Sequence, residues 1–266
     1  MTRCGLVVTT YARPDALARV LDAVATQSRP PDELLVADDG SGPATARVVE
    51  QHAARAGYPV RHVWQPHDGF RAGRVRNAAI ARTRCEYLVL LDGDMVVHPA
   101  FLADHLALAR GGHYSQGVRI LLDAAATARL LQPGSPLPGP LAAGLGGVRR
   151  SYALRKPGLA RLLRGVANGL IAVKACNQGF WRDDLLLVNG FDEALTGWGA
   201  EDKELCARLA NAGVGRQTLL FAALAWHLDH APASRAHAEA NRARWRDTVR
   251  SRRVRCETGI DGHPAA

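Results

Sequence analysis

The chain has 266 residues, a formal net charge of +9 and a hydrophobic content of 47%. This content is sufficient for a full core and excludes a largely disordered chain. The positive charge favours anionic partners, namely nucleotide phosphates, nucleic acid or an anionic membrane surface. Five scattered cysteines, odd in number and without Cys-x-x-Cys spacing, argue against a disulfide framework or a zinc site and favour a reducing cytosol.

The chain enters an apolar pattern at Leu6 and contains no run of about 18 apolar residues. We therefore expect neither a signal peptide nor a transmembrane helix, and a cytoplasmic location.

The first hundred residues alternate between short apolar runs and amphipathic segments. The patterns predict strands at residues 4–10, 34–37, 60–64 and 87–91, and helices at 15–27, 44–56 and after Gly73. Strand and helix in alternation form a parallel sheet with right-handed crossovers. The predicted fold class is therefore α/β.

Carboxylates follow two of these strands. Asp92 and Asp94 flank Gly93 after the strand at 87–91, and Asp39 follows the strand at 34–37. A buried carboxylate is costly unless it is paired or binds a metal, and Gly93 allows the sharp turn that lets both acids face one pocket. Carboxylate oxygens suit Mg²⁺ or Mn²⁺. The alternative is an ordinary surface turn, because Asp-Gly is a common turn dipeptide.

A basic segment precedes the third helix. Arg71, Arg74 and Arg76 lie with two glycines next to the helix start, where arginine side chains and backbone amides can hold phosphate. The alternative is a solvated basic face of the helix.

Two basic segments, residues 149–174 and 235–255, indicate contact with an anionic membrane surface. Residues 124–182 contain nine Lys or Arg and no carboxylate, and leucines at helical spacing after Pro157 predict a basic amphipathic helix to about Val173. This helix either lies in a membrane interface or packs on its own sheet. The tail at 235–255 has eight arginines and is predicted to be a solvated helix.

The segment around Trp198 combines an aromatic ring with acids. Glycines on both sides of Trp198 predict a tight loop that can close on a sugar face. Glu201 and Asp202 begin a helix, where the positive end of the helix dipole favours anions, so simple capping is the alternative. His227 follows an apolar run, and a single histidine in such a place is more often structural than a metal ligand. His230, three residues later, is a weaker candidate for a metal ligand than His227.

Four motifs together resemble the nucleotide-sugar-binding half of family 2 glycosyltransferases with the GT-A fold. They are residues 7–11, residues 36–41, the Arg76-Asn77-x-Ala79 motif and residues 91–94. Residues 197–202 are similar to the galactosyltransferase-type carboxyl-terminal segment of chondroitin polymerases and of related bacterial polysaccharide and lipopolysaccharide transferases. The resemblance implies a single GT-A domain, with a nucleotide half at 1–100, an acceptor half at 101–232 and a basic tail at 233–266.

The resemblance also implies roles for individual residues. The donor nucleotide would be held by Thr9, Tyr11, Arg13, Asp39, Arg71, Arg76, Asn77, Asp92, Gly93 and Trp198. Asp94 would bind the metal directly, His227 would complete the metal site, and Asp92 would support it through the ribose or a metal-bound water. Asp202 would be the general base, and Glu201 would hold the acceptor or donor sugar.

The predicted activity is that of a metal-dependent inverting hexosyltransferase. It would use Mn²⁺ or Mg²⁺ and move a sugar from a nucleotide diphosphate sugar, expected to be a UDP-hexose or UDP-N-acetylhexosamine, to a glycan or lipid-linked acceptor. A peripheral position on the inner face of the membrane is a second hypothesis for its location.

Different functions remain open at this point. Within enzymes they are a retaining glycosyltransferase and a nucleotidyltransferase on a similar fold, although a nucleotidyltransferase would carry a glycine-rich loop where this chain has Thr9-Thr10-Tyr11. Outside enzymes they are a catalytically silent sugar-nucleotide binder and a basic module that binds membranes or nucleic acid. No helix-turn-helix, zinc finger or aromatic RNA-binding signature is present, so no specific nucleic-acid partner is expected.

Overall fold

A seven-stranded sheet in the order β3-β2-β1-β4-β8-β6-β9 organises the molecule. The computed structural model describes residues 2–145, 147–165 and 172–265. The strands of this sheet are β1 (Cys4–Thr10), β2 (Glu33–Asp38), β3 (Val60–Trp64), β4 (Tyr87–Asp92), β6 (His113–Gly117), β8 (Asn177–Trp181) and β9 (Gly215–Leu219). The predicted α/β class with a mostly parallel sheet is confirmed.

Strands β3, β2, β1 and β4 are parallel, and β1 and β2 at their centre are buried. Every residue of β1 and β2 is buried, as expected for parallel strands covered on both faces. In the register, Thr10 of β1 lies opposite Asp38 of β2, and Thr9 lies opposite Asp92 of β4. The acids that follow β2 and β4 therefore meet at the carboxyl edge of the sheet.

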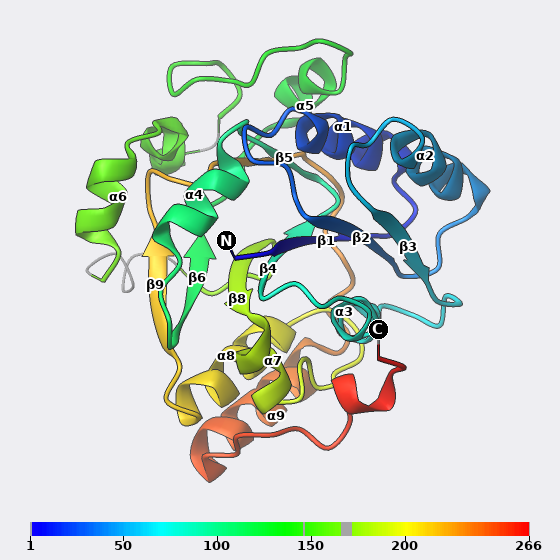
Figure 1. Cartoon of the computed structure of the whole chain (residues 1–266), viewed down its shortest axis with the longest axis vertical. Helices are drawn as coiled ribbons and strands as arrows, with labels where there is room; N and C mark the ends of the chain where they lie inside the picture. The colour runs from blue at the N-terminus through cyan, green and yellow to red at the C-terminus, as the bar shows by residue number, and fades with distance from the viewer. Residues whose placement is uncertain (1, 146, 166–171, 266) are drawn as a thin grey trace.

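Helices cover both faces of the sheet. The helices are α1 (Pro14–Ala25), α2 (Pro43–Ala53), α3 (Ala72–Ala81), α4 (Phe101–Leu108), α5 (Ala124–Leu130), α6 (Pro157–Leu163), α7 (Arg182–Leu187), α8 (Glu201–Asn211) and α9 (Ala238–Ser251), with 3₁₀ turns η1 (Gly147–Ala153) and η3 (Ile260–Gly262). In Figure 1, α1 and α2 lie on one face of β1 and β2, and α3 lies on the other. One apolar core lies on each face.

Strand β8 joins the two halves of the chain. It pairs antiparallel with β4 on one side and with β6 on the other. A smaller sheet, in the order β5-β10-β7, contains β5 (Met95–Val97), β10 (Ala225–His227) and β7 (Ile120–Leu121). Its register places His227 opposite Met95, so His227 lies beside the Asp92–Asp94 turn although it is far along the chain.

The predicted long basic helix after Pro157 is only partly present. Helix α6 ends at Leu163, and residues 166–171 of the prediction lie outside the described residues. Leu159 and Leu162 of α6 are 40% and 76% exposed. The apolar face that these leucines form on α6 is therefore exposed to solvent at Leu159 and Leu162.

The tail that was predicted to be a solvated helix forms helix α9, which is exposed on one side and buried on the other. In α9, Asn241 and Thr248 are buried, and Arg244 donates to Asp192 at 2.6 Å. Arg242, Arg246 and Arg250 pair with acids of α9 itself and remain exposed. Arg253 lies 3.8 Å from Glu204 of α8, and Arg255 pairs with Asp261.

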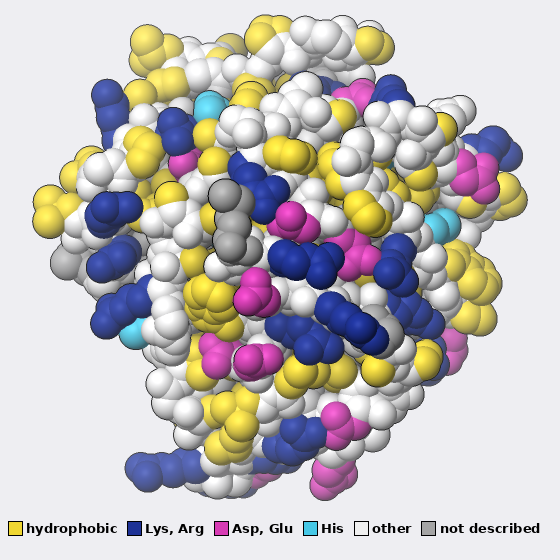
Figure 2. Space-filling view, viewed as in Figure 1, with side chains coloured by type: hydrophobic (Ala, Val, Ile, Leu, Met, Phe, Trp, Pro, Cys, Tyr) yellow, Lys and Arg dark blue, Asp and Glu magenta, His cyan; other side chains and the backbone are white. Residues whose placement is uncertain are grey.

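Charge of both signs is mixed on the surface. Figure 2 shows Lys and Arg side chains interspersed with Asp and Glu in the middle of the displayed face. All five cysteines are buried and free, which agrees with the expected absence of disulfides. In the part of the chain that is described, no helix is both long and apolar enough to span a bilayer.

Candidate active site

The carboxyl edge of β1 and β4 opens into a cavity of about 650 Å³. This volume is in the range of small-molecule sites. Nearly all the residues that the sequence motifs single out line it, namely Thr9, Tyr11, Arg13, Asp39, Arg76, Asp92, Gly93, Asp94, Trp198, Glu201, Asp202 and His227. Elements from both halves of the chain thus form one site.

The Asp92–Asp94 turn lies directly on the end of β1. The amide of Gly93 donates to the Thr9 carbonyl at 2.7 Å. A Cβ atom at position 93 would lie 3.0 Å from the Thr9 carbonyl oxygen and 3.0 Å from the Thr10 Cβ atom. This close approach requires glycine, and it holds the two acids at the cavity wall.

Asp94 lies in a cluster of nitrogen donors. Its Oδ2 atom is 3.1 Å from His230 Nε2, 3.7 Å from His227 Nε2 and 3.5 Å from the Arg13 guanidinium. Burial tends to raise the pKa of Asp94, but the hydrogen bond from His230 and the neighbouring positive charges outweigh it and lower the pKa. Asp94 is therefore ionised at neutral pH.

The donor atoms of this cluster fit a divalent cation. One atom each of Asp94, His227 and His230 lies within 4.8 Å of the other two. Asp94 Oδ1 is buried and has no hydrogen-bond partner among the described residues. Burial lowers the pKa of His227 to about 4, so its imidazole is neutral and able to act as a ligand. Carboxylate oxygen and imidazole nitrogen together suit Mn²⁺.

Asp92 has a different partner. Its Oδ1 atom accepts a hydrogen bond from Arg76 at 2.8 Å, and Arg76 Nε also donates to Thr9 Oγ1 at 3.0 Å. The Arg76 guanidinium lies 5.3 Å from the centroid of the Phe191 ring. Burial raises the pKa of Asp92, and Arg76 opposes this shift. Asp92 is outside the group of three metal-binding candidates.

Asp39 and Tyr11 form the far end of the cavity. Asp39 accepts from Gln65 Nε2 at 2.6 Å and from the Arg71 amide at 2.8 Å, and its burial raises its pKa. Tyr11 is 47% exposed and stacks on His67 with a centroid distance of 4.4 Å. A carboxylate acceptor and a flat exposed ring are therefore available to a planar ligand.

The start of α8 presents two acids to the cavity. Asp202 accepts from the Ala175 amide at 3.2 Å and from the Lys203 amide at 2.8 Å. Glu201 turns back to accept from the Gly199 amide at 3.0 Å. Burial raises the pKa of Asp202; burial and then the Asp202 charge raise that of Glu201. Asp202 is thus a stronger base than an ordinary aspartate.

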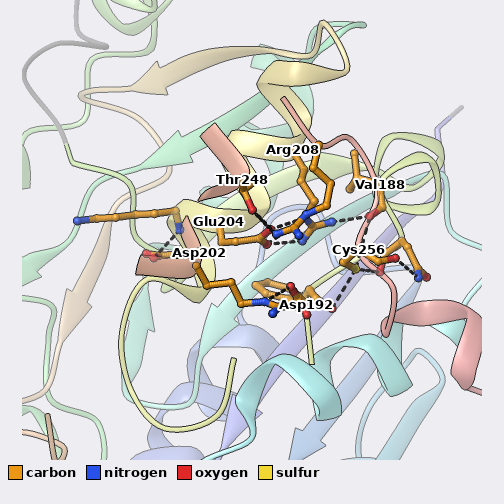
Figure 3. Close-up of polar contacts among 12 residues, drawn as sticks. Val188, Asp192, Asp202, Glu204, Arg208, Thr248 and Cys256 are labelled. Atoms are coloured by element: carbon orange, nitrogen blue, oxygen red, sulfur yellow. Dashed lines mark hydrogen bonds and ion pairs between the residues drawn. The ribbon is translucent and has the colours of Figure 1, made fainter. Parts of the chain in front are cut away.

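A buried ion pair fixes the orientation of α8 behind these acids (Figure 3). Glu204 and Arg208 are fully buried and joined by three hydrogen bonds of 2.7–3.0 Å. Thr248 of α9 donates to Glu204 at 2.9 Å, and Arg208 also donates to the carbonyl of Val188. Helix α9 therefore supports the helix that carries Asp202.

Two predicted donor-binding residues, Asn77 and Arg71, are not among the residues that line the cavity. Asn77 is fully buried and bonds to the backbone of Phe191 and to Glu193. It connects α3 to the loop after α7. The Arg71 side chain pairs with Asp68, and only its backbone amide supports Asp39. Asn77 belongs to the Arg76-Asn77-x-Ala79 motif, whose spacing does not distinguish a residue that supports the fold from one that contacts a ligand.

Sequence reasoning also missed several residues that line the cavity, namely Thr10, Phe70, Arg119, Lys174, Arg235 and Arg242. Of these, only Thr10 lies in a motif that carried the resemblance. The sequence ranks His230 as the weaker ligand candidate, yet it is closer to Asp94 than His227 is. The only sign in the sequence that His230 could join His227 in a metal site was its position three residues later.

Two family models match the chain. "Glycosyl transferase family 2" matches residues 6–124, and "N-terminal domain of galactosyltransferase" matches residues 172–230. The two matches cover the turn with Asp94, the α8 acids and both histidines of the cluster.

Known proteins are similar over almost the whole chain. Validoxylamine A glucosyltransferase of Streptomyces hygroscopicus subsp. limoneus is 27% identical over 98% of this chain, which spans only 57% of that relative's length. The structure of S. aureus TarS residues 1–349 with UDP matches with a TM-score of 0.63 and 15% identity, over 98% of this chain and 68% of that one.

A second solved structure resembles the chain to a similar extent. The mannosyltransferase PcManGT of Pyrobaculum calidifontis, in complex with GDP-Man and Mn²⁺, matches with a TM-score of 0.59 and 19% identity, over 91% of this chain and 60% of that one. At these identities the structural likeness concerns the fold. The structural likeness shows that the chain has the GT-A fold, and both matching family models are models of glycosyltransferases.

Proposed function

We propose that the chain transfers a sugar from a nucleotide diphosphate sugar to an acceptor hydroxyl, with a divalent metal and with inversion at the anomeric carbon. One observation carries this proposal. The Asp94–His227–His230 cluster and the partly buried base Asp202 face the same cavity of about 650 Å³. The names of the similar structures, which mention UDP, GDP-Man and Mn²⁺, support it.

The donor nucleotide occupies the β1–β4 side of the cavity in this proposal. Tyr11 offers an exposed ring for the base, and Asp39 offers carboxylate oxygens to a base N–H or a ribose hydroxyl. Arg76 holds Asp92 in place, so that Asp92 has an acceptor oxygen available for the ribose. UDP is the expected nucleotide.

The metal site comprises Asp94, His227 and His230, with Asp92 in support. A bound Mn²⁺ or Mg²⁺ supplies Lewis-acid stabilisation of the charge on a leaving diphosphate. Arg13 lies 3.5 Å from Asp94 and adds positive charge at the same place.

Asp202 is the general base of the proposed reaction. It takes the proton of the acceptor hydroxyl while that oxygen forms a bond to the anomeric carbon and the bond to the diphosphate oxygen breaks. The backbone amides of Ala175 and Lys203 hold the carboxylate in a fixed orientation. Glu201 is placed to hold a sugar hydroxyl next to it.

A panel of nucleotide sugars tests the proposal. With Mn²⁺ present, UDP-, GDP- and dTDP-sugars are screened for thermal stabilisation and for release of the nucleoside diphosphate. We expect one nucleotide to stabilise the chain by about 2.7 kcal/mol at 100 times its dissociation constant. Release of a sugar 1-phosphate would instead indicate a nucleotidyltransferase, which breaks the bond between the two phosphates. Retention of the anomeric configuration in the product, seen by NMR, would contradict the inverting mechanism.

The acceptor is a glycan or a lipid-linked sugar, and we propose contact with an anionic membrane surface through residues 149–174. Leu159 and Leu162 are exposed beside Arg161 and Arg164, a combination that suits a membrane interface. The tail at 235–255 is a weaker candidate because most of its arginines are paired. Flotation with anionic liposomes at low salt tests this contact, and a protein that stays at the bottom of the gradient would refute it.

A further inference from the structure

The wall of the cavity towards α8 and α9 carries an excess of positive charge. Near β1 and β4, Arg13 pairs with Asp94 and Arg76 pairs with Asp92, so charge is largely compensated there. The α8 side presents two acids, Glu201 and Asp202, and four basic side chains, Lys174, Lys203, Arg235 and Arg242. An anionic group on a ligand at this side of the cavity would compensate the excess.

Arg235 and Arg242 are the cations best placed to meet a ligand. The Arg235 guanidinium lies 5.7 Å from the centroid of the Trp198 ring, and no described carboxylate lies within 4.0 Å of it. Arg242 bonds to Glu239 at 2.9 Å, but the Glu239 side chain is 68% exposed. An exposed pair of this kind is worth little, so Arg242 can exchange this partner for a ligand anion.

Both arginines flank the first turn of α9, which packs on the loop that leads to Asp202. A Cβ atom at Gly197 would lie 2.6 Å from the His237 ring, and one at Gly199 would lie 3.6 Å from Ala238. The backbone that carries Arg235 and Arg242 is therefore packed against the loop that leads to the proposed base, Asp202. The exposed part of Trp198 lies beside it and offers an apolar surface to a sugar ring.

We infer that the acceptor is an anionic sugar, whose phosphate or carboxylate group binds Arg235 and Arg242 while its hydroxyl faces Asp202. The inference rests on the proposed function and specifies its acceptor class. Guanidinium groups bind phosphate and carboxylate through paired hydrogen bonds, which fix the orientation of the ligand as well as its charge. The anion thereby aligns the hydroxyl with the base.

Binding to the protein loaded with UDP and Mn²⁺ tests the inference without knowledge of the natural acceptor. Calorimetry compares glucose, glucose 6-phosphate and glucuronic acid. We expect at least one of the two anionic sugars to bind about tenfold more tightly than glucose, which corresponds to about 1.4 kcal/mol. The two anionic sugars distinguish a phosphate from a carboxylate acceptor. Equal affinities for all three sugars would overturn the inference.

Charge-removing variants locate the effect. Arg235→Gln and Arg242→Gln should each weaken binding of the anionic sugar about tenfold and leave glucose binding unchanged. Arg250→Gln is the matched control, because this α9 side chain is 83% exposed and outside the cavity lining. An equal loss for neutral and anionic sugars in Arg235→Gln would indicate a structural role and overturn the assignment. A loss of UDP binding would reassign the arginine to the donor.

Failure of this inference can be told apart from failure of the proposed function. Slow release of UDP from the donor sugar in the absence of any acceptor reports the donor and metal site alone. If this release is present while acceptor charge has no effect, only the anionic-acceptor inference fails. If no nucleotide sugar is bound or cleaved, the proposed function fails as well.

Discussion

At the scale of single residues, similar acids in the cavity have different chemical properties because their neighbours differ. Asp94 lies among imidazoles and a guanidinium that favour its charged form. Burial raises the pKa of Asp202, and this effect outweighs the opposing effect of the nearby Arg76, Lys174 and Lys203 charges. Because their surroundings differ, the two aspartates suit different proposed roles, Asp94 as a metal ligand and Asp202 as a proton acceptor.

Replacement of Asp202 by Asn should remove sugar transfer and leave nucleotide binding nearly unchanged. The amide keeps the size of the side chain but cannot accept the proton, and a general base contributes about 10²- to 10⁴-fold to the rate. Transfer rates and UDP thermal shifts measure the two effects. Asp183→Asn, at an exposed acid in α7, serves as the control. Normal turnover of the Asp202 variant would remove the assignment.

The raised pKa of Asp202 should appear in the pH profile of transfer. The base acts in its deprotonated form, so the rate should fall as pH falls through this pKa. Because burial raises the pKa, the acidic limb should lie above the usual aspartate range near 3.9. Steady-state rates at saturating metal check this, and an acidic limb at or below that range would be inconsistent with Asp202 as the base.

Replacement of His227 by Ala should weaken the metal-dependent part of UDP binding. The variant loses one of three donor atoms that lie within 4.8 Å of each other. UDP-induced stabilisation is measured with Mn²⁺ and after chelation with EDTA. We expect the wild type to lose most of the stabilisation with EDTA and the variant to show little in either condition. Stabilisation that is indifferent to EDTA in the wild type would contradict the metal site.

At the scale of secondary-structure elements, α8 and α9 act as one unit. Their contact depends on Glu204, which is buried and charged and therefore stable only with all its partners. Thr248 and Arg208 supply those partners from α9 and α8. The position of Asp202 at the start of α8 therefore depends on the basic tail.

Thr248→Val should lower the free energy of unfolding by about 1–3 kcal/mol, because a buried carboxylate oxygen loses a donor. Urea denaturation measures the loss. Thr248→Ser keeps the hydroxyl and should be closer to the wild type. If the Val variant is as stable as the wild type and the Ser variant is not, the methyl group and not the hydrogen bond is what matters.

The sequence revealed those parts of the site that local chemistry specifies. Asp92–Gly93–Asp94 follows a buried strand, so both its position and its role could be predicted. The Glu204–Thr248 contact could not, because it joins positions 44 residues apart on two helices whose packing no local pattern describes. The contacts of Asn77 with Phe191 and Glu193 were not predictable for a related reason: an asparagine in a motif looks the same whether it binds a ligand or the backbone.

At the scale of the whole molecule, the parallel nucleotide half was predictable and the acceptor half was less so. In the first half, apolar runs and helical patterns alternate with short loops. In the second half, β8 inserts antiparallel between β4 and β6, a pairing between positions far apart that periodicity does not encode. The leucines at helical spacing after Pro157 are also ambiguous, because the same pattern occurs in a helix that packs on its own sheet and in a helix whose leucines are exposed.

Stability of the fold should decrease between pH 6.5 and pH 4 through His105. Burial lowers the pKa of this fully buried histidine to about 4, and its Nε2 atom bonds to Asn177 at 2.9 Å. The unfolded chain binds the proton first as pH falls, so about 3 kcal/mol of stability is lost across this window. His105→Gln should flatten the pH dependence of urea unfolding. Identical slopes for variant and wild type would rule His105 out.

The place of β8 in the sheet limits how this chain can be divided or recombined. Strand β4 lies between β1 and β8, so a fragment that ends near residue 100 would leave one edge of β4 unpaired. A buried, apolar strand with an open edge is a template for aggregation. A chimera that takes its nucleotide half from this chain must therefore include a strand equivalent to β8, which makes residues 177–181 part of the smallest exchangeable unit.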